Sequence, residues 1–224
     1  MTATREIVMK TDLELRLEVE REFALDPKVD SSNIAVTVKN AVVTLTGQVQ
    51  SYATKWEVEN VVKHIVGVTA IADDLKVTLR GDQPNDADLR QRVLQALEAN
   101  AFVPSETIKP IVQDGWVTLQ GNALYHYERQ DAENVVRSLP GVRGITDSIT
   151  IDNPVEPEDV NEEIADALAQ SPRIDAHHIT VQVNGRTVIL EGSVRSLAER
   201  DDVEAAAWTA PGVNSVENHL IVRC

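Results

Sequence analysis

One six-residue pattern occurs three times in this chain. It reads VVTLTG at 42–47, WVTLQG at 116–121 and TVILEG at 187–192, so that its final glycines lie 74 and 71 residues apart. Such a period is too long for the unit of a solenoid, and it is long enough for a small domain. The sequence therefore predicts three copies of one domain rather than a single large fold.

Other positions repeat in step with this pattern. In each copy a second glycine follows the first after 20 residues, and an isoleucine precedes the first by thirteen. The two sets of structural glycines are Gly47, Gly121 and Gly192, then Gly67, Gly141 and Gly212. The copies align across these positions without a gap and predict domains at 10–80, 84–153 and 154–224. The segments between them, RGDQPN and DNPVEPE, are polar and contain proline, as linkers do.

The first part of each copy is predicted to be a helix. In copy two, DADLRQRVLQALEA places Leu89, Val93 and Leu97 on one apolar stripe. Copy one is ambiguous, because LELRLEVE alternates apolar and charged residues and by itself favours a strand. Its alignment with the other copies decides for a helix. The aligned stripes are Leu15, Val19 and Phe23 in copy one, and Val160, Ile164 and Leu168 in copy three.

The rest of each copy predicts a hairpin, a second helix and a last strand. Two β-rich runs flank a short turn, and Val58, Val61, Val62 and Ile65 then form a helical core stripe. The second glycine ends this helix, and the crossover returns the last strand parallel to the second strand. The predicted class is α+β, with three α-β-β-α-β domains. Each domain is a three-stranded mixed sheet covered on one face by two helices.

Charge and composition exclude several classes of function. The net charge of −15 repels phosphate backbones, which argues against nucleic-acid binding. No apolar run has the length of a membrane span, and the first residues do not form a signal peptide, so a cytoplasmic location is expected. The single Cys224 is the last residue and cannot form an intramolecular disulfide.

No catalytic motif stands out in the sequence. There is no glycine-rich phosphate loop and no paired-cysteine zinc signature, so we expect no enzyme activity, no cofactor and no metal. One alternative is a metal held by Asp175, His177, His178 and His219. The simpler interpretation of the DAHH segment is a polar approach to a strand.

The outward face of the second helix supplies the candidate binding residues. Trp56 lies two positions from the core residue Val58, roughly 160–200° around the helix. Tyr52 and Lys63 share its face, and Trp208 occupies the position of Lys63 in copy three. Tryptophan is seldom left in water. The face therefore packs against another copy, binds a protein partner or a second chain, or contacts a membrane surface.

The repeated motifs resemble the BON domain, a bacterial module named for osmotically inducible and nodulation proteins. The resemblance lies in the V-T-L-x-G strand end, the glycine 20 residues later and the tail G-V-x-x-V-x-N-x-L-x-V. Copy three carries the whole tail from Gly212 to Val222, whereas copies one and two have Asp73 and Asp147 in place of Asn218. The resemblance implies a non-enzymatic module linked to phospholipid surfaces and osmotic stress, and one relative senses potassium.

These observations lead to two functional hypotheses. The first is a non-enzymatic binding or interaction protein of the bacterial stress response, which contacts proteins or a phospholipid surface through Tyr52, Trp56, Lys63 and Trp208. The alternative is a sensor of a small ion, potassium by the resemblance, or of another small ligand.

Overall fold

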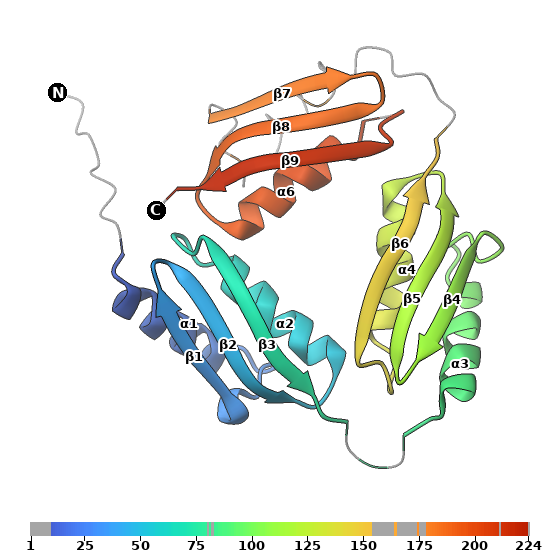
Figure 1. Ribbon diagram of the computed structural model, residues 1–224, viewed down its shortest axis with the longest axis horizontal. Helices are drawn as coiled ribbons and strands as arrows, with labels where there is room; N and C mark the ends of the chain where they lie inside the picture. Colours follow the sequence, from blue (N-terminus) through green and yellow to red (C-terminus); the bar gives the residue numbers. More distant parts are fainter. Residues whose placement is uncertain are drawn as a thin grey trace.

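The computed structural model describes residues 10–79, 81, 83–153, 164, 174, 178–210 and 212–223. Domain 1 runs from α1 to β3, with the labels of Figure 1. Its elements are α1 (Asp12–Leu25), a short 3₁₀ turn (Ser31–Asn33), β1 (Ile34–Lys39), β2 (Val42–Val49), α2 (Tyr52–Lys63) and β3 (Ala70–Val77).

Domain 2 repeats the order of helices and strands, and domain 3 repeats it from its first strand onward. Domain 2 consists of α3 (Asp86–Ala99), β4 (Ile108–Gln113), β5 (Trp116–Ala123), α4 (His126–Arg137) and β6 (Gly144–Ile151). Domain 3 shows β7 (Ile179–Asn184), β8 (Thr187–Val194), α6 (Leu197–Ala207) and β9 (Ser215–Val222). Of its predicted first helix, Val160 and Leu168 lie outside the described residues. Ile164 is helical and fully buried in the core of domain 3.

Each sheet has the predicted mixed topology. The first two strands pair antiparallel, as in Val36 opposite Leu45, and the third pairs parallel to the second, as in Gly47 opposite Leu75. The strand orders are β1-β2-β3, β4-β5-β6 and β7-β8-β9. In domains 1 and 2 both helices cover the same face of the sheet (Figure 1). The predicted α+β class of three repeated units is confirmed.

Helix α1 forms although its own sequence alternates like a strand. Thr11 and Glu14 make a capping box, in which each side chain accepts the backbone N–H of the other residue. The predicted stripe of Leu15, Val19 and Phe23 is buried. The charged residues between them face water, so burial of three large apolar side chains against the sheet decides the conformation.

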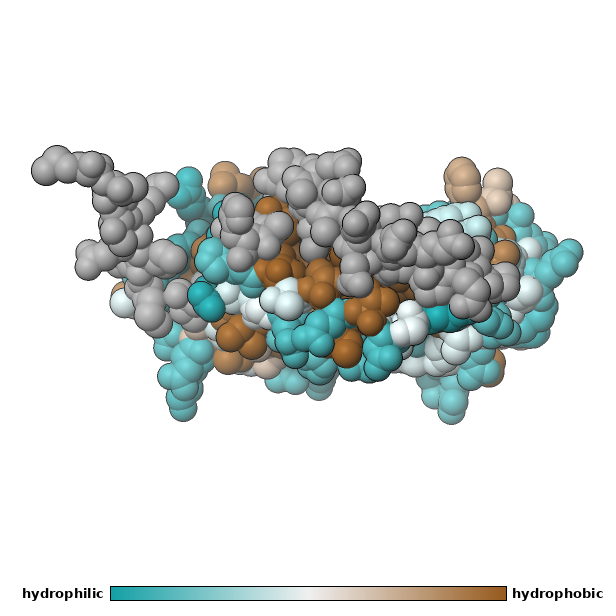
Figure 2. Space-filling view, turned by 90° about the horizontal axis from the view of Figure 1, so that it is seen from above, coloured by the Kyte–Doolittle hydropathy of each residue, from teal (hydrophilic) through white to brown (hydrophobic). Residues whose placement is uncertain are grey.

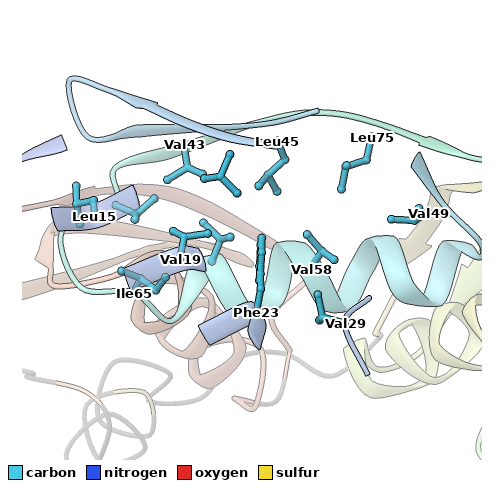
Figure 3. Packing of buried hydrophobic residues seen from close by; sticks show 13 residues of the cluster. Leu15, Val19, Phe23, Val29, Val43, Leu45, Val49, Val58, Ile65 and Leu75 are labelled. Atoms are coloured by element: carbon cyan, nitrogen blue, oxygen red, sulfur yellow. The ribbon is translucent and has the colours of Figure 1, made fainter. Parts of the chain in front are cut away.

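Each domain has its own apolar core. In domain 1 the side chains of α1 point toward Val43, Leu45 and Leu75 of the sheet (Figure 3). Helix α2 adds Val58 and Val62, which are fully buried. Val61 is only partly buried, so the predicted core stripe is narrower than its spacing suggested.

The repeated glycines mark a close approach of two backbones. Gly47, Gly121 and Gly192 have φ values of 133°, 133° and 128°. A Cβ at these positions would lie 2.0, 2.0 and 2.1 Å from the carbonyl oxygens of Asn33, Thr107 and His178. No side chain fits there, which explains why the pattern ends on glycine in every copy. The second set, Gly67, Gly141 and Gly212, has φ values of 98°, 103° and 83° just past the second helix.

An aspartate at the start of the first helix holds the hairpin turn. The Asp12 carboxylate accepts the N–H groups of Asn40 and Ala41, both at 2.9 Å, and these hydrogen bonds hold its pKa below the ordinary value. Asp86 accepts the N–H groups of the turn in domain 2 at 2.8 and 3.0 Å. These hydrogen bonds to the turn were not predicted, although Asp12 and Asp86 align in the repeat.

The close approach at Gly121 predicts a large effect of adding one methyl group. We expect Gly121→Ala to destabilise the protein by about 2–4 kcal/mol, because the backbone must move to clear the Thr107 carbonyl. Gly185→Ala is the matched control. Gly185 also has positive φ (61°), but no atom lies within 4 Å of the point that its Cβ would occupy, so about 1 kcal/mol is expected. Urea unfolding compares the two variants, and equal losses would contradict the steric explanation.

Candidate functional site

The second helices of the three domains meet at one cavity. The domains are arranged as a triangle, with the last strand of each sheet on its inner side (Figure 1). A cavity of about 340 Å³ lies between α2, α4 and α6, and residues of all three helices line it. Ligand sites favour such positions between domains. We take this junction as the candidate site.

Two positions of the second helix build every junction. The first position of the helix is Tyr52, His126 or Leu197, and the other, eleven residues later, is Lys63, Arg137 or Trp208. The start of each helix meets the end of the next, from domain 1 to domain 2, from 2 to 3 and from 3 back to 1. The contacts differ in chemistry at each of the three junctions.

Domains 1 and 2 meet through an aromatic–cation contact. The Arg137 guanidinium lies 3.9 Å from the centroid of the Trp56 ring, and Tyr52 packs against the core of domain 2. Glu133 holds Arg137 in place through an ion pair of 3.1 Å. A cation over an indole ring is attracted by the ring. When this contact is partly desolvated, salt screens it less than it screens an exposed ion pair.

Domains 2 and 3 meet through stacked rings. His126 and Trp208 are nearly parallel, with centroids 4.6 Å apart and an interplanar angle of 7°. Burial, and to a lesser extent the charge of Arg129, lowers the pKa of His126 to about 4. His126 Nδ1, Trp208 Nε1 and the nearby Arg137 Nε are buried without a hydrogen-bond partner among the described residues. These atoms lose their hydrogen bonds to water and gain none from the described residues in return. This cost weakens the junctions that bury them.

Domains 3 and 1 meet through an ion pair and an apolar contact. Lys63 Nζ lies 2.7 Å from Asp201 Oδ2, and Leu197 packs against the core of domain 1. The Gly67 N–H donates to the carbonyl of Arg195 at 3.2 Å. The side chains of Lys63 and Asp201 are 34% and 53% exposed, so salt screens their attraction.

A carboxylate pair lies beside this third junction. Burial, followed by hydrogen bonding to Asp73, raises the pKa of Glu59 to about 7. Burial alone would raise the pKa of Asp73, but its hydrogen bonds with Glu59 and Lys55 keep it below the ordinary value. Asp73 also accepts the Leu75 N–H at 2.9 Å, as Asn218 accepts the Leu220 N–H at 3.1 Å. Aspartate and asparagine thus make the same local bond at the tail position where the copies differ.

The structure gathers the four predicted binding residues at the junctions. Trp56, Lys63 and Trp208 line the cavity, and Tyr52 lies at the junction of domains 1 and 2. Of the three alternatives that the sequence left open, the structure shows contact with another copy, because Trp56 meets Arg137 and Trp208 meets His126 of domain 2. Their binding of a partner outside the chain stays a prediction. The sequence analysis missed Arg137 and His126, although the repeat aligns them with Lys63 and Tyr52.

The described residues offer no other obvious centre of chemistry. Among them, no three His, Cys, Asp or Glu side chains are grouped to hold a metal, and no helix is long and apolar enough to cross a membrane. Asp175 and His177 of the alternative metal site lie outside the described residues.

Three BON domains account for this architecture. The model of the BON domain family matches residues 11–78, 85–153 and 158–224, so the chain belongs to the BON domain family, as the repeated motif predicted. The osmotically-inducible protein Y of Escherichia coli (strain K12) is 26% identical over 147 residues, which cover 62% of this chain and 71% of that protein.

Two solved structures also match this chain at low similarity. Both are of CdsD, a structural protein of the type III secretion system of Chlamydia trachomatis, and each is 16% identical to this chain. The likeness covers 92% of this chain and 91% of one structure, with a TM-score of 0.26. For the C-terminal domain of CdsD it covers 96% and 100%, with a TM-score of 0.27. Scores this low carry no functional argument.

The ion pair predicts that charge reversal opens the third junction. Lys63→Glu and Asp201→Lys each place like charges at the position of the 2.7 Å contact, so each should weaken the junction by about 1 kcal/mol at low salt. The double variant restores the opposite charges. Small-angle scattering should show expansion in the single variants and recovery in the double variant. Arg16→Glu, which breaks an ion pair within α1, is the control. Expansion that persists in the double variant would contradict this role of the pair.

The half-buried His126 predicts that acid weakens the second junction. Its pKa is about 4 in the folded chain against an ordinary 6.5, so the open form binds the proton more tightly. Stability from this group is complete above pH 6.5 and is lost as the pH falls toward 4. At pH 5 we expect a loss of about 1 kcal/mol after allowance for solvent screening.

A variant without a titrating ring isolates this effect. His126→Phe keeps an aromatic ring against Trp208, so its stability should change less than that of the wild type between pH 7.5 and pH 5. Urea unfolding at the two pH values measures the difference. Equal losses in both proteins would assign the pH dependence to other groups.

Proposed function

We propose that this BON protein is a non-enzymatic binding protein of a bacterial osmotic-stress response, and that the cavity between α2, α4 and α6 is its binding site. The family and the name of its Escherichia coli relative support the stress role. The observation that carries the site is that one cavity is lined by the second helix of every domain. A molecule bound there touches three domains at once.

This geometry couples binding to the arrangement of the domains. A ligand that requires all three helices binds only the closed triangle, and by mass action it shifts the chain toward that state. The three junctions rest on few polar contacts, and the first two bury polar atoms that have no hydrogen-bond partner among the described residues, so a modest ligand affinity is enough to affect them. Of the two functional hypotheses, we therefore favour the second, in which the protein senses a small ligand.

A second candidate function is protein binding at an exposed apolar cluster of domain 2. Phe102, Leu124, Tyr125 and Tyr127 are between 44% and 66% exposed at one end of this domain, and the two tyrosine rings stack 5.5 Å apart. On the face shown in Figure 2, apolar residues likewise interrupt a mostly hydrophilic surface. The net charge of −15 disfavours an anionic phospholipid surface as the partner. The cytoplasmic location expected from the sequence stays a prediction.

Thermal melting and small-angle scattering in the presence of single probes test the proposal. The probes are potassium, sodium and calcium chlorides, anionic liposomes and uncharged small solutes. We expect one class of small probe to raise the midpoint of melting saturably and to reduce the radius of gyration. Trp208→Ala, which opens the cavity wall, should abolish both effects. Binding of liposomes alone, or no saturable response to any probe, would contradict a cavity site.

A further inference from the structure

Six of the charged groups that line the central cavity are already paired with one another. Lys63 pairs with Asp201 at 2.7 Å, Arg137 pairs with Glu133 at 3.1 Å, and Arg129 pairs with Asp147. Glu204, the remaining carboxylate of the lining, accepts a hydrogen bond of 3.0 Å from the Asn218 amide. A charged ligand would have to displace one of these partners. The cavity is therefore better suited to a molecule without net charge.

Three side-chain amides of the lining have no such partner among the described residues. The side-chain amides of Asn60, Gln130 and Asn134 line the cavity and make no hydrogen bond with any of the residues that the structure describes. Asn60 is half-buried, and Gln130 and Asn134 are exposed. An amide both donates and accepts hydrogen bonds, as a hydroxyl group does. The free polar surface of the cavity therefore matches a ligand that carries several hydroxyl groups.

The repeat explains how two of these amides come together. Asn60 of α2 and Asn134 of α4 occupy the same position of their domains, and the third copy has Ala205 there. All three residues line the cavity, so the same position of the repeat contributes to the wall from each of the three domains. Ala205 also shows that this position of the helix accepts alanine without loss of the fold.

Two indole rings add apolar surface to the same wall. Trp56 of α2 and Trp208 at the end of α6 line the cavity. One face of Trp56 is covered by Arg137 and one face of Trp208 by His126, so a ligand meets the remaining surface of each ring. The C–H groups of a polyol or a sugar ring carry partial positive charge and pack favourably on such rings. The volume of about 340 Å³ lies in the range of small-molecule sites.

We propose that the central cavity binds a small uncharged polyhydroxylated molecule, a polyol or a sugar of one or two rings. Asn60, Gln130 and Asn134 bind its hydroxyl groups, and Trp56 and Trp208 pack against its C–H faces. This inference rests on the proposed function, because it names the class of ligand for the same cavity.

Isothermal titration calorimetry on the full chain tests the class of ligand. Sorbitol, glucose and trehalose are the polyhydroxylated probes, glutamate and potassium chloride are the charged ones, and glycine betaine is a zwitterion without hydroxyl groups. We expect saturable binding of at least one polyhydroxylated probe with a Kd in the millimolar range or below. The double variant Asn60→Ala/Asn134→Ala should weaken this binding at least tenfold. Gln113→Ala, which removes an exposed amide of β4 far from the cavity, should leave it unchanged.

The remaining outcomes separate the two proposals. Binding of a charged or zwitterionic probe that depends on Asn60 and Asn134 would overturn the ligand class and keep the cavity as the site. Stabilisation that rises without saturation in every variant reflects exclusion of the solute from the protein surface, and it would also overturn the class. If no probe binds and the double variant leaves melting and scattering unchanged under every condition, the proposed function fails as well.

Discussion

Each second helix has two faces that must be covered at once, and the whole arrangement of this protein depends on that constraint. One face of α2 buries Val58 and Val62 in its own domain. The opposite face carries Trp56, which is not part of the core of its own domain. The ring is covered from outside its own domain, by Arg137 of domain 2. Closing the same contact three times brings three helices to one cavity.

The repeat supplies the geometry of the junctions and the side chains supply their chemistry. A cation lies over an indole ring at the first, two rings stack at the second, and an exposed ion pair holds the third. These contacts respond to different conditions. Salt acts mainly on Lys63 and Asp201, and protons act on His126. Different side chains at equivalent positions therefore make the junctions respond differently to salt and to pH, although the backbone arrangement is the same.

The centre of the triangle combines paired charges with free amides. Six charged groups of the wall are paired with one another and Glu204 accepts a hydrogen bond from Asn218, so the neutral groups, above all Asn60 and Asn134, remain available for a ligand. Buried atoms without partners among the described residues, such as His126 Nδ1 and Trp208 Nε1, make the closed state costly. A closed state of limited stability is one that a weakly bound small molecule can favour, which suits a protein of a stress response.

The sequence by itself determined the repeat, the order of the elements and the core of each copy. Local patterns carry this information. Position 47 must be glycine because the Asn33 carbonyl lies where a Cβ would be, and the spacing of apolar residues marks the buried stripe of each helix. The alignment even overruled the misleading alternation around Val19. It also indicated that Trp56 and Trp208 lie outside the core of their own domains. It did not reveal which residues cover them.

Only the tertiary structure decided that Arg137 covers Trp56, that His126 stacks on Trp208, and that Lys63 pairs with Asp201. These partners lie 81, 82 and 138 residues apart in the chain, and no periodicity links them. Their meeting depends on the relative orientation of whole domains, which is set by the sum of many contacts across the junctions. The cavity, with Asn60 and Asn134 at its wall, exists only because that orientation closes the triangle.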